Sequence, residues 1–204
     1  MEHGKQTTPD RPDRDREHAE DLFAIQETLR GRRDAFESIV ERYTPLLYSL
    51  AYRMLATREE AEEAVQEILI KTYRSLRQFR LHRRFHPWIY TIALNHLRSC
   101  QRKARRKGRS NIVAFDELIL QSSVPAGEAG PEELAQQGEG ERLAAAAIRA
   151  LRSEYREVFL LRQVEGLSVA EVSEILELPE GTVKTYLHRA RRELIELLAG
   201  EGFG

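Results

Sequence analysis

Aromatic rings and positive charges alternate over residues 79–98. Four rings stand among four arginines there, namely Phe79, Phe85, Trp88 and Tyr90 among Arg80, Arg83, Arg84 and Arg98. Single-stranded nucleic acid is bound by this combination, because cations hold the backbone while flat faces or pockets take unstacked bases. Asn95 adds an amide that can pair with a base edge. In the alternative interpretation, Trp88, Phe79 and Phe85 are core anchors and Asn95 is an exposed polar residue of a helix.

A second group of polar and basic residues recurs at helical spacing after Pro179. Four apolar residues lie within about 60° of one another around this predicted helix, namely Val183, Leu187, Ala190 and Leu194. The opposite face carries small, polar and basic side chains, namely Gly181, Thr185, His188 and Arg192, with Lys184 and Arg189 beside them. A short preceding helix is predicted to begin at Ser168, an N-cap with Glu171 three residues later.

These two helices predict a helix-turn-helix whose second helix recognises the DNA major groove. Thr185, His188 and Arg189 are expected to reach base edges or phosphates. Arg191 and Arg192 are expected to hold the backbone. A charged helical hairpin that does not bind DNA is the alternative interpretation.

The elements that carry these residues are predicted to be helices. Apolar spacing predicts one helix at 21–29, which Gly31 ends, and continues across 35–54. Pro45 lies inside the second pattern, so a kink or two abutting helices are expected there. The same spacing predicts further helices at 143–150 and 154–164.

Thr57 is expected to begin the helix that precedes the aromatic and basic segment, with Glu60 completing a capping box. Its acids gather in the first turns and its bases in the last, as the helix dipole favours. Residues 78–86 are then expected to form a loop closed by Pro87. A further helix follows and runs into a basic tail at 98–109.

Charge is segregated along the chain, although the formal net charge is only −1. Residues 59–67 hold five glutamates and no base, residues 71–109 hold thirteen Lys or Arg and no acid, and residues 110–141 hold seven acids and no base. The basic block is an electrostatic footprint for a polyanion. A solvated, Arg-rich helix face is the alternative interpretation.

The acidic stretch is also rich in Pro and Gly, a composition typical of a linker. We therefore predict an all-α fold of two small helical domains joined by a flexible acidic linker, with a helix-turn-helix in the C-terminal domain. The expected boundaries are a disordered tail at 1–19, a first domain at 20–108, the linker at 109–140 and a second domain at 141–199.

Composition excludes several classes of protein. The single cysteine of the 204 residues excludes an internal disulfide framework and a four-cysteine zinc site. No apolar run approaches the ~18 residues that span a bilayer, and residues 1–20 lack the apolar core of a secretory signal. A cytoplasmic protein is therefore expected. Few aromatics and few β-branched runs argue against an all-β fold.

Three stretches resemble the extracytoplasmic-function (ECF) sigma factors, the smallest bacterial sigma factors of the sigma-70 superfamily. Residues 61–67 (AEEAVQE) resemble the helix with which that family docks on core RNA polymerase. Residues 85–95 resemble its element for reading the minus-ten promoter region, and residues 181–192 resemble its recognition helix for the minus-thirty-five region. The similarity covers about 20–105 and 141–199, and the order and spacing of the motifs make it specific.

The sequence departs from the family pattern at three places. Residues 80–84 read Arg-Leu-His-Arg-Arg, where the family usually has small and acidic residues, so the contact with a flipped base is expected to differ. Tyr186 stands where a basic residue is common. Glu63 and Ala64 stand where relatives often have Asp and Leu.

The resemblance implies a protein that performs no catalysis and needs no cofactor or metal. Its partners would be core RNA polymerase, bound through Glu63, Gln66 and Glu67, and promoter DNA, with an anti-sigma factor as a further candidate. Melted minus-ten DNA would meet Phe79, Arg80, Arg83, Arg84, Trp88, Tyr90, Ile92, Ala93, Asn95 and Arg98. Duplex minus-thirty-five DNA would meet Thr182, Lys184, Thr185, Tyr186, His188, Arg189, Arg191 and Arg192.

The acidic linker would thread toward the polymerase active centre. No membrane insertion and no small-molecule substrate is expected.

Two other classes of protein are weighed against this interpretation. A stand-alone helix-turn-helix regulator would explain 141–199 but leaves the module around Trp88 without a role. An enzyme is the third class, because His82 and His86 stand four apart and suggest a metal pair. Pro87 follows them directly and the surroundings are cationic, which makes a poor divalent site.

Cys100 lies among bases that can lower a thiol pKa, but a buried or merely tolerated cysteine is the preferred interpretation.

Overall fold

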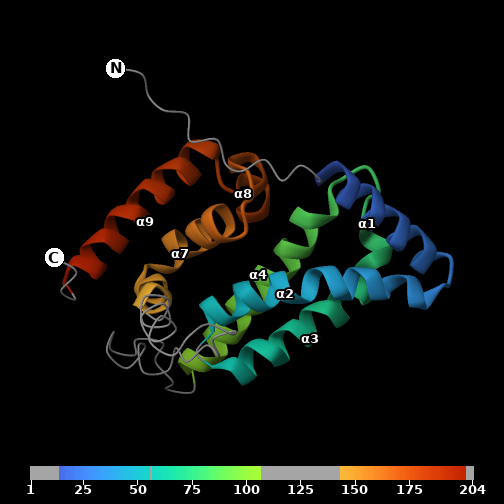
Figure 1. The fold of residues 1–204 in the computed structure, drawn as a ribbon, viewed down its shortest axis with the longest axis horizontal. Coiled ribbons are helices and arrows are strands. Elements are labelled where there is room, and N and C mark those ends of the chain that lie inside the picture. The colour runs from blue at the N-terminus through green and yellow to red at the C-terminus, as the bar shows by residue number, and fades with distance from the viewer. Residues whose placement is uncertain (1–13, 56, 107–142, 201–204) are drawn as a thin grey trace, which may run out of the picture.

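The structure is a computed structural model that describes residues 14–55, 57–106 and 143–200, and every regular element in these ranges is helical. Figure 1 shows two groups of helices side by side. We call residues 14–106 the first bundle and residues 143–200 the second bundle. The expected all-α fold is confirmed. The expected linker at 109–140 lies outside the described residues, as do residues 1–13 of the expected tail.

The first bundle consists of α-helices and two short 3-10 segments. In chain order its described elements are α1 Arg14–Leu29, a 3-10 segment Arg33–Phe36, α2 Glu37–Met54, α3 Arg58–Ser75, a 3-10 segment Leu76–Gln78, and α4 Phe85–Arg106. None of the described helices in either bundle has the length and apolar character needed to cross a membrane.

The first helix begins earlier than expected, because residues 14–19 belong to α1 and not to a disordered tail. Arg42 on α2 explains this extension. Its Nη1 donates to the backbone oxygen of Glu17 at 2.9 Å and to Asp21 Oδ1 at 2.6 Å, and its Nη2 pairs with Glu20. These contacts join positions more than 20 residues apart, so local spacing could not have indicated them.

α2 is a single helix with Pro45 inside it, so of the two outcomes expected there the division into two abutting helices is excluded. The expected loop before Pro87 needs correction. α4 begins at Phe85, so the expected loop at 78–86 is shorter, and the basic residues up to Arg106 are helical. Pro87 is tolerated in the first turn of α4, because the first amide groups of a helix have no intrahelical acceptor.

The helix ends follow the capping residues of the sequence. The Thr57 side chain accepts a hydrogen bond from the Glu60 amide at 3.2 Å, which confirms the predicted N-cap of α3. Gly31 follows α1 with a φ of 101°, in the left-handed region that glycine adopts without strain. Ser168 and Glu171 form the complete capping box predicted for α8.

The second bundle contains the predicted helix-turn-helix. Its described elements are a helix at 143–150, α7 Ser153–Phe159, a π-helical segment Leu160–Val164, α8 Val169–Leu176 and α9 Glu180–Gly200. α8 ends at Leu176, and the next residue, Glu177, turns the chain sharply before α9 with a φ of 55° and a ψ of 40°. α8 and α9 pack against each other, as a helix-turn-helix requires.

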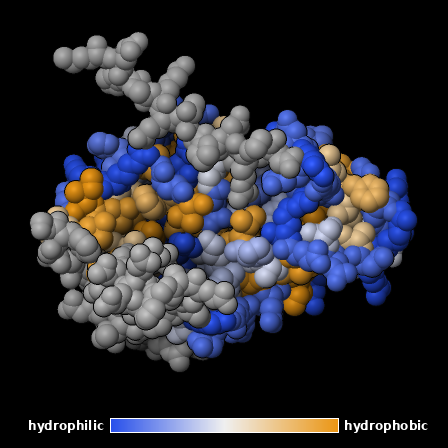
Figure 2. Space-filling model, in the orientation of Figure 1, coloured by the Kyte–Doolittle hydropathy of each residue, from blue (hydrophilic) through white to orange (hydrophobic). Residues whose placement is uncertain are grey.

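The apolar stripes of both bundles form one continuous core. Ile25, Leu47, Ile68, Ile89 and Leu94 are buried in the first bundle, and Leu160, Leu161 and Val183 in the second. The bundles meet where α4 packs against α8. Figure 2 shows mostly hydrophilic residues on the visible face of the first bundle, whereas more of the hydrophobic surface gathers over the second.

Candidate nucleic-acid and protein interfaces

Most side chains on the outer face of α9 are exposed, whereas its apolar stripe faces the core of the second bundle. Val183, Leu187 and Ala190 are buried, as the apolar spacing predicted. Most of the side chains predicted to contact minus-thirty-five DNA are exposed, namely Lys184, Thr185, His188, Arg189, Arg191 and Arg192, whereas Thr182 and Tyr186 are half-buried. The structure therefore brings these residues together on one side of one helix.

Local contacts orient this face but leave its cations accessible. Thr185 Oγ1 donates to the Gly181 carbonyl oxygen at 2.8 Å within the helix. Arg189 Nη1 lies 3.4 Å from the Tyr155 hydroxyl, and the Tyr186 ring packs edge-on against Tyr155 with centroids 5.3 Å apart. Exposed contacts of this kind contribute little, so a DNA phosphate can displace them.

The aromatic residues at the start of α4 form a compact cluster. The ring centroids of Phe79, Phe85 and Trp88 lie 5.2–5.5 Å apart. Phe85 is fully buried and Phe79 is nearly so, which favours the core-anchor interpretation for these two rings. Trp88 is half-buried at the edge of the cluster. The cluster thus fixes both ends of the basic loop 80–84, which immediately precedes α4.

Other predicted minus-ten residues divide into exposed and buried groups. Arg80, Arg83, Arg84 and Asn95 are exposed, and Ile92 and Arg98 are half-buried. Tyr90 and Ala93 are fully buried. In this arrangement DNA cannot contact Tyr90 or Ala93, because the second bundle and the core cover them.

The acidic side of α3 is turned to solvent. Ala61, Ala64, Val65 and Ile68 face the core. Glu63, Gln66 and Glu67 are all exposed on the other side. Such an exposed acidic helix face suits a positively charged protein surface.

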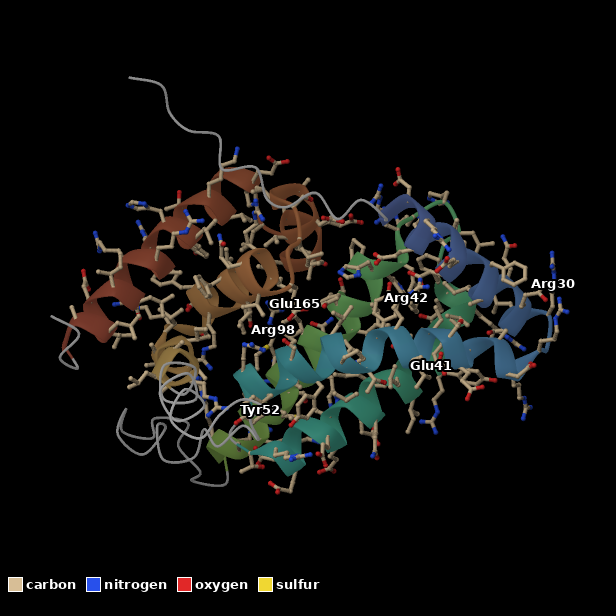
Figure 3. All side chains as sticks on the ribbon, in the orientation of Figure 1. Arg30, Glu41, Arg42, Tyr52, Arg98 and Glu165 are labelled. Atoms are coloured by element: carbon tan, nitrogen blue, oxygen red, sulfur yellow. The ribbon has the colours of Figure 1, made fainter. Side chains whose placement is uncertain are left out.

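Acidic residues of the second bundle contact the basic side of the first. Arg98 on α4 donates to both carboxylate oxygens of Glu157 on α7, at 2.8 and 2.6 Å. The Tyr90 hydroxyl donates to Glu165 at 2.5 Å. Figure 3 shows Arg98 and Glu165 at the boundary between α4 and the second bundle. Sequence reasoning missed these acids, because nothing in their local sequence marks them.

The residues considered for an enzyme do not assemble into a site. Among the described residues, no three His, Cys, Asp or Glu side chains come together as metal ligands. Burial raises the pKa of the Cys100 thiol, in spite of the nearby lysines that lower it. The neighbouring bases therefore do not activate this cysteine, which corrects one of the two sequence interpretations.

Each bundle matches a family of known proteins. Residues 39–108 match the family of Sigma-70 region 2, and residues 141–194 match the family of Sigma-70, region 4. The chain is 34% identical over 172 residues to the ECF RNA polymerase sigma factor SigW of Bacillus subtilis, covering 83% of this chain and 92% of that protein. It is 30% identical over 180 residues to the ECF RNA polymerase sigma-E factor of Escherichia coli K12, covering 87% and 94%.

Two solved structures share the fold. One is CnrH in complex with the cytosolic domain of CnrY, with a TM-score of 0.64, 23% identity, and coverage of 90% of this chain and 99% of that chain. The other is the sigma factor RpoE in complex with the anti-sigma factor NepR from Bartonella quintana, with a TM-score of 0.62, 25% identity, and coverage of 80% and 96%.

Proposed function

This chain belongs to the ECF sigma factors of the sigma-70 family, and we propose how its residues divide the work of that family. Its partners are core RNA polymerase and promoter DNA, and its role is to direct transcription initiation. Sigma factors are generally not enzymes, and we expect the chain itself to perform no catalysis. A stand-alone helix-turn-helix regulator is not favoured, because both sigma regions match.

The first bundle is proposed to read the minus-ten region. Its contact residues would be the exposed basic loop 80–84, the edge of Trp88, Ile92 and Asn95. Support comes from the exposure of the loop arginines and of Asn95, and from the helical spacing that puts Trp88, Ile92 and Asn95 on one face of α4. Phe79 and Ala93 would shape this surface from beneath, and Tyr90 and Arg98 would join it once the second bundle moves away.

The second bundle is proposed to read the minus-thirty-five region as duplex DNA. The exposed face of α9 would enter the major groove, with Thr185, His188 and Arg189 near base edges and Arg191 and Arg192 on phosphates. Lys184 and the half-buried Thr182 and Tyr186 would complete the contact at the start of the helix. The supporting observation is that α9 turns its apolar stripe inward and this face outward.

The acidic face of α3 is proposed to dock on core polymerase. Glu63, Gln66 and Glu67 are exposed together, and the buried stripe on the opposite side holds α3 in the bundle without them. An anti-sigma factor is proposed as a further partner, in line with the complex of the structurally similar RpoE with NepR. One observation supports the whole proposal. The chain has three separate exposed surfaces, on α3, at the start of α4 and on α9, and the charge of each suits its proposed partner.

A binding experiment separates this proposal from a stand-alone regulator. Protection of a duplex promoter would be measured with the chain alone, with core polymerase alone and with both. A sigma factor is expected to give sequence-specific protection and run-off transcripts only when both are present. Specific protection by the chain alone, unchanged by core polymerase, would instead support the regulator.

A further inference from the structure

A groove lies between α1 and the start of α2 in the first bundle. Its volume is about 680 Å³, and the described residues that line it come from α1, from the 3-10 segment Arg33–Phe36 and from α2. It is separate from the surfaces proposed above for core polymerase and DNA. Most of its lining residues are exposed, so it is an open groove and not an enclosed pocket. Such a groove suits a segment of a protein, because small ligands are mostly buried in their sites.

Phe23 provides most of the apolar surface of this groove. It is 67% exposed, whereas the next two residues, Ala24 and Ile25, are buried in the core. Ala19 lies one turn earlier on the same face of α1, and Ala35 lines the groove from the 3-10 segment. Figure 2 shows hydrophobic residues among hydrophilic ones where α1 and α2 form the visible face. A large ring beside further apolar surface marks an interaction site.

Ion pairs join the two walls of the groove. Arg42 on α2 donates to Asp21 Oδ1 on α1 at 2.6 Å and also pairs with Glu20. The Tyr43 hydroxyl donates to Asp21 Oδ2 at 2.6 Å. Figure 3 shows Arg42 between α2 and α1. The groove is therefore formed before any partner binds, which reduces the conformational entropy lost on binding.

The rim of the groove is acidic. Asp34, Glu37 and Glu41 are exposed, and none of the three has an ion pair within the part of the chain that the structure describes. Glu20 is a fourth acid of the lining and is already paired with two arginines. Unpaired carboxylates repel DNA phosphates and favour lysine or arginine side chains. The groove therefore suits a partner that is both apolar and basic.

The segments of this chain outside the described residues do not have that composition. Residues 1–13 contain no large apolar side chain except Met1. Residues 110–141 hold seven acids and no base, and residues 201–204 hold one acid and no base. The acidic rim would repel the last two segments. The occupant is therefore expected to come from another protein.

We propose that this groove binds a basic amphipathic helix of a partner protein other than core polymerase. An amphipathic helix lays its apolar face in a groove, with anchors three or four residues apart. Its apolar side chains would cover Phe23, and its Lys or Arg side chains would pair with Asp34, Glu37 and Glu41. This inference goes beyond the proposed function, which uses α3, α4 and α9 and leaves the groove accessible to a further protein.

The first test measures binding of the full-length chain to two synthetic peptides by fluorescence anisotropy. Both are labelled helices of about 18 residues, or five turns, with leucine along one face. The other positions are lysine in one peptide and glutamate in the other. The lysine peptide should bind, and the glutamate peptide should bind at least about tenfold more weakly.

The contribution of Phe23 is measured with the lysine peptide. Phe23→Ala should weaken its binding about tenfold or more, because aromatic anchors supply much of the binding free energy at interfaces. Ile195→Ala is the matched control, since Ile195 is also an apolar residue that is 67% exposed. The control should bind the peptide as the wild type does.

The contribution of the rim is measured in the same way. The double variant Glu37→Gln and Glu41→Gln should weaken binding of the lysine peptide about fivefold, because it removes two charges that face the lysines. The control is Glu63→Gln with Glu67→Gln, which removes two exposed acids from α3 and should leave the affinity unchanged. Circular dichroism checks that each variant keeps its helices.

The second test separates the partner from core polymerase. Phe23→Ala and the double variant at Glu37 and Glu41 should bind core polymerase as the wild type does and should give the same yield of run-off transcripts. Sedimentation should show the same monomeric state for the wild type and Phe23→Ala.

Four results would overturn the proposal. One is equal affinity of the wild type and Phe23→Ala for the lysine peptide, and another is an equal loss in the two double variants. A third is loss of core-polymerase binding in Phe23→Ala, and the fourth is self-association of the wild type that Phe23→Ala abolishes, because a second copy would then fill the groove. None of them would contradict the proposed function, which run-off transcription by the wild type tests separately.

Discussion

The Tyr90 hydroxyl donates a 2.5 Å hydrogen bond to a carboxylate oxygen of Glu165, 75 positions further along the chain. Ser49 Oγ donates to the other oxygen of the same carboxylate at 3.3 Å. Glu165 follows the π-helical segment at 160–164 and precedes Gly166, whose φ is 67°. An irregular turn of backbone thus directs one acid of the second bundle at two helices of the first.

Replacing Tyr90 by Phe should weaken this junction. The variant removes one hydrogen bond to a charged group, and such bonds contribute on the order of 1.5–3 kcal/mol. Urea unfolding should show a loss within that range, while Tyr73→Phe, at an exposed position of α3, should change little. An unfolding free energy for Tyr90→Phe equal to that of the wild type would show that the bond adds no stability.

Charge reversal on α3 should weaken binding to core polymerase. The double variant Glu63→Lys and Glu67→Lys changes only exposed side chains, so the helical content should stay normal. Affinity in a pull-down with core polymerase should fall roughly tenfold or more, because like charges would then face each other. Glu41→Lys is the control for a change of charge elsewhere, and its affinity should be retained. Equal affinities of the double variant and the control would refute the docking assignment.

Removing the N-cap of α8 should destabilise the second bundle. The Ser168 side chain accepts from the Glu171 amide at 3.2 Å and donates to the Glu171 carboxylate at 2.7 Å. Ser168→Ala should cost about 0.5–2 kcal/mol of unfolding free energy, measured by urea denaturation. Ser38→Ala, a change at an exposed serine of α2, should cost less. A smaller loss for Ser168→Ala than for Ser38→Ala would contradict the role of this cap.

Cys100 should react slowly with alkylating reagents in the folded chain. Burial raises the pKa of its thiol, so at pH 8 a smaller fraction is thiolate than in the unfolded chain. The rate of iodoacetamide labelling at pH 8 should therefore rise when urea unfolds the protein. Labelling that is faster in the native protein would indicate an activated thiol and contradict this account of Cys100.

The sequence predicted the features that depend on neighbouring residues. The caps at Thr57 and Ser168 form as expected, and the exposed face of α9 follows from the spacing of Val183, Leu187 and Ala190. Each of these depends on side chains within a few turns of one helix. Their pattern is therefore visible before any tertiary contact is known.

The features that sequence reasoning missed depend on contacts between distant segments. Helix α1 includes residues 14–19 because Arg42 holds them from another helix. The resemblance implies a DNA contact for Tyr90, yet in this arrangement Tyr90 is fully buried and its hydroxyl donates to Glu165. Charge counts along the chain showed separate basic and acidic blocks, but they could not show that Glu157 would fall opposite Arg98.

The division of labour between the bundles can be tested by selecting active promoters from a randomised library with core polymerase. The wild-type protein should select two blocks of sequence at a fixed separation. Asn95→Ala should relax only the downstream block. Arg189→Ala should cost on the order of 1–3 kcal/mol and relax only the upstream block if Arg189 reads a base, and should otherwise weaken binding evenly and lower the salt slope by about one.

The losses from Asn95→Ala and Arg189→Ala should add in the double variant, because the two side chains lie in separate bundles. The account predicts two independent blocks, each lost with its own residue. A downstream block altered by Arg189→Ala, or an upstream block altered by Asn95→Ala, would contradict it.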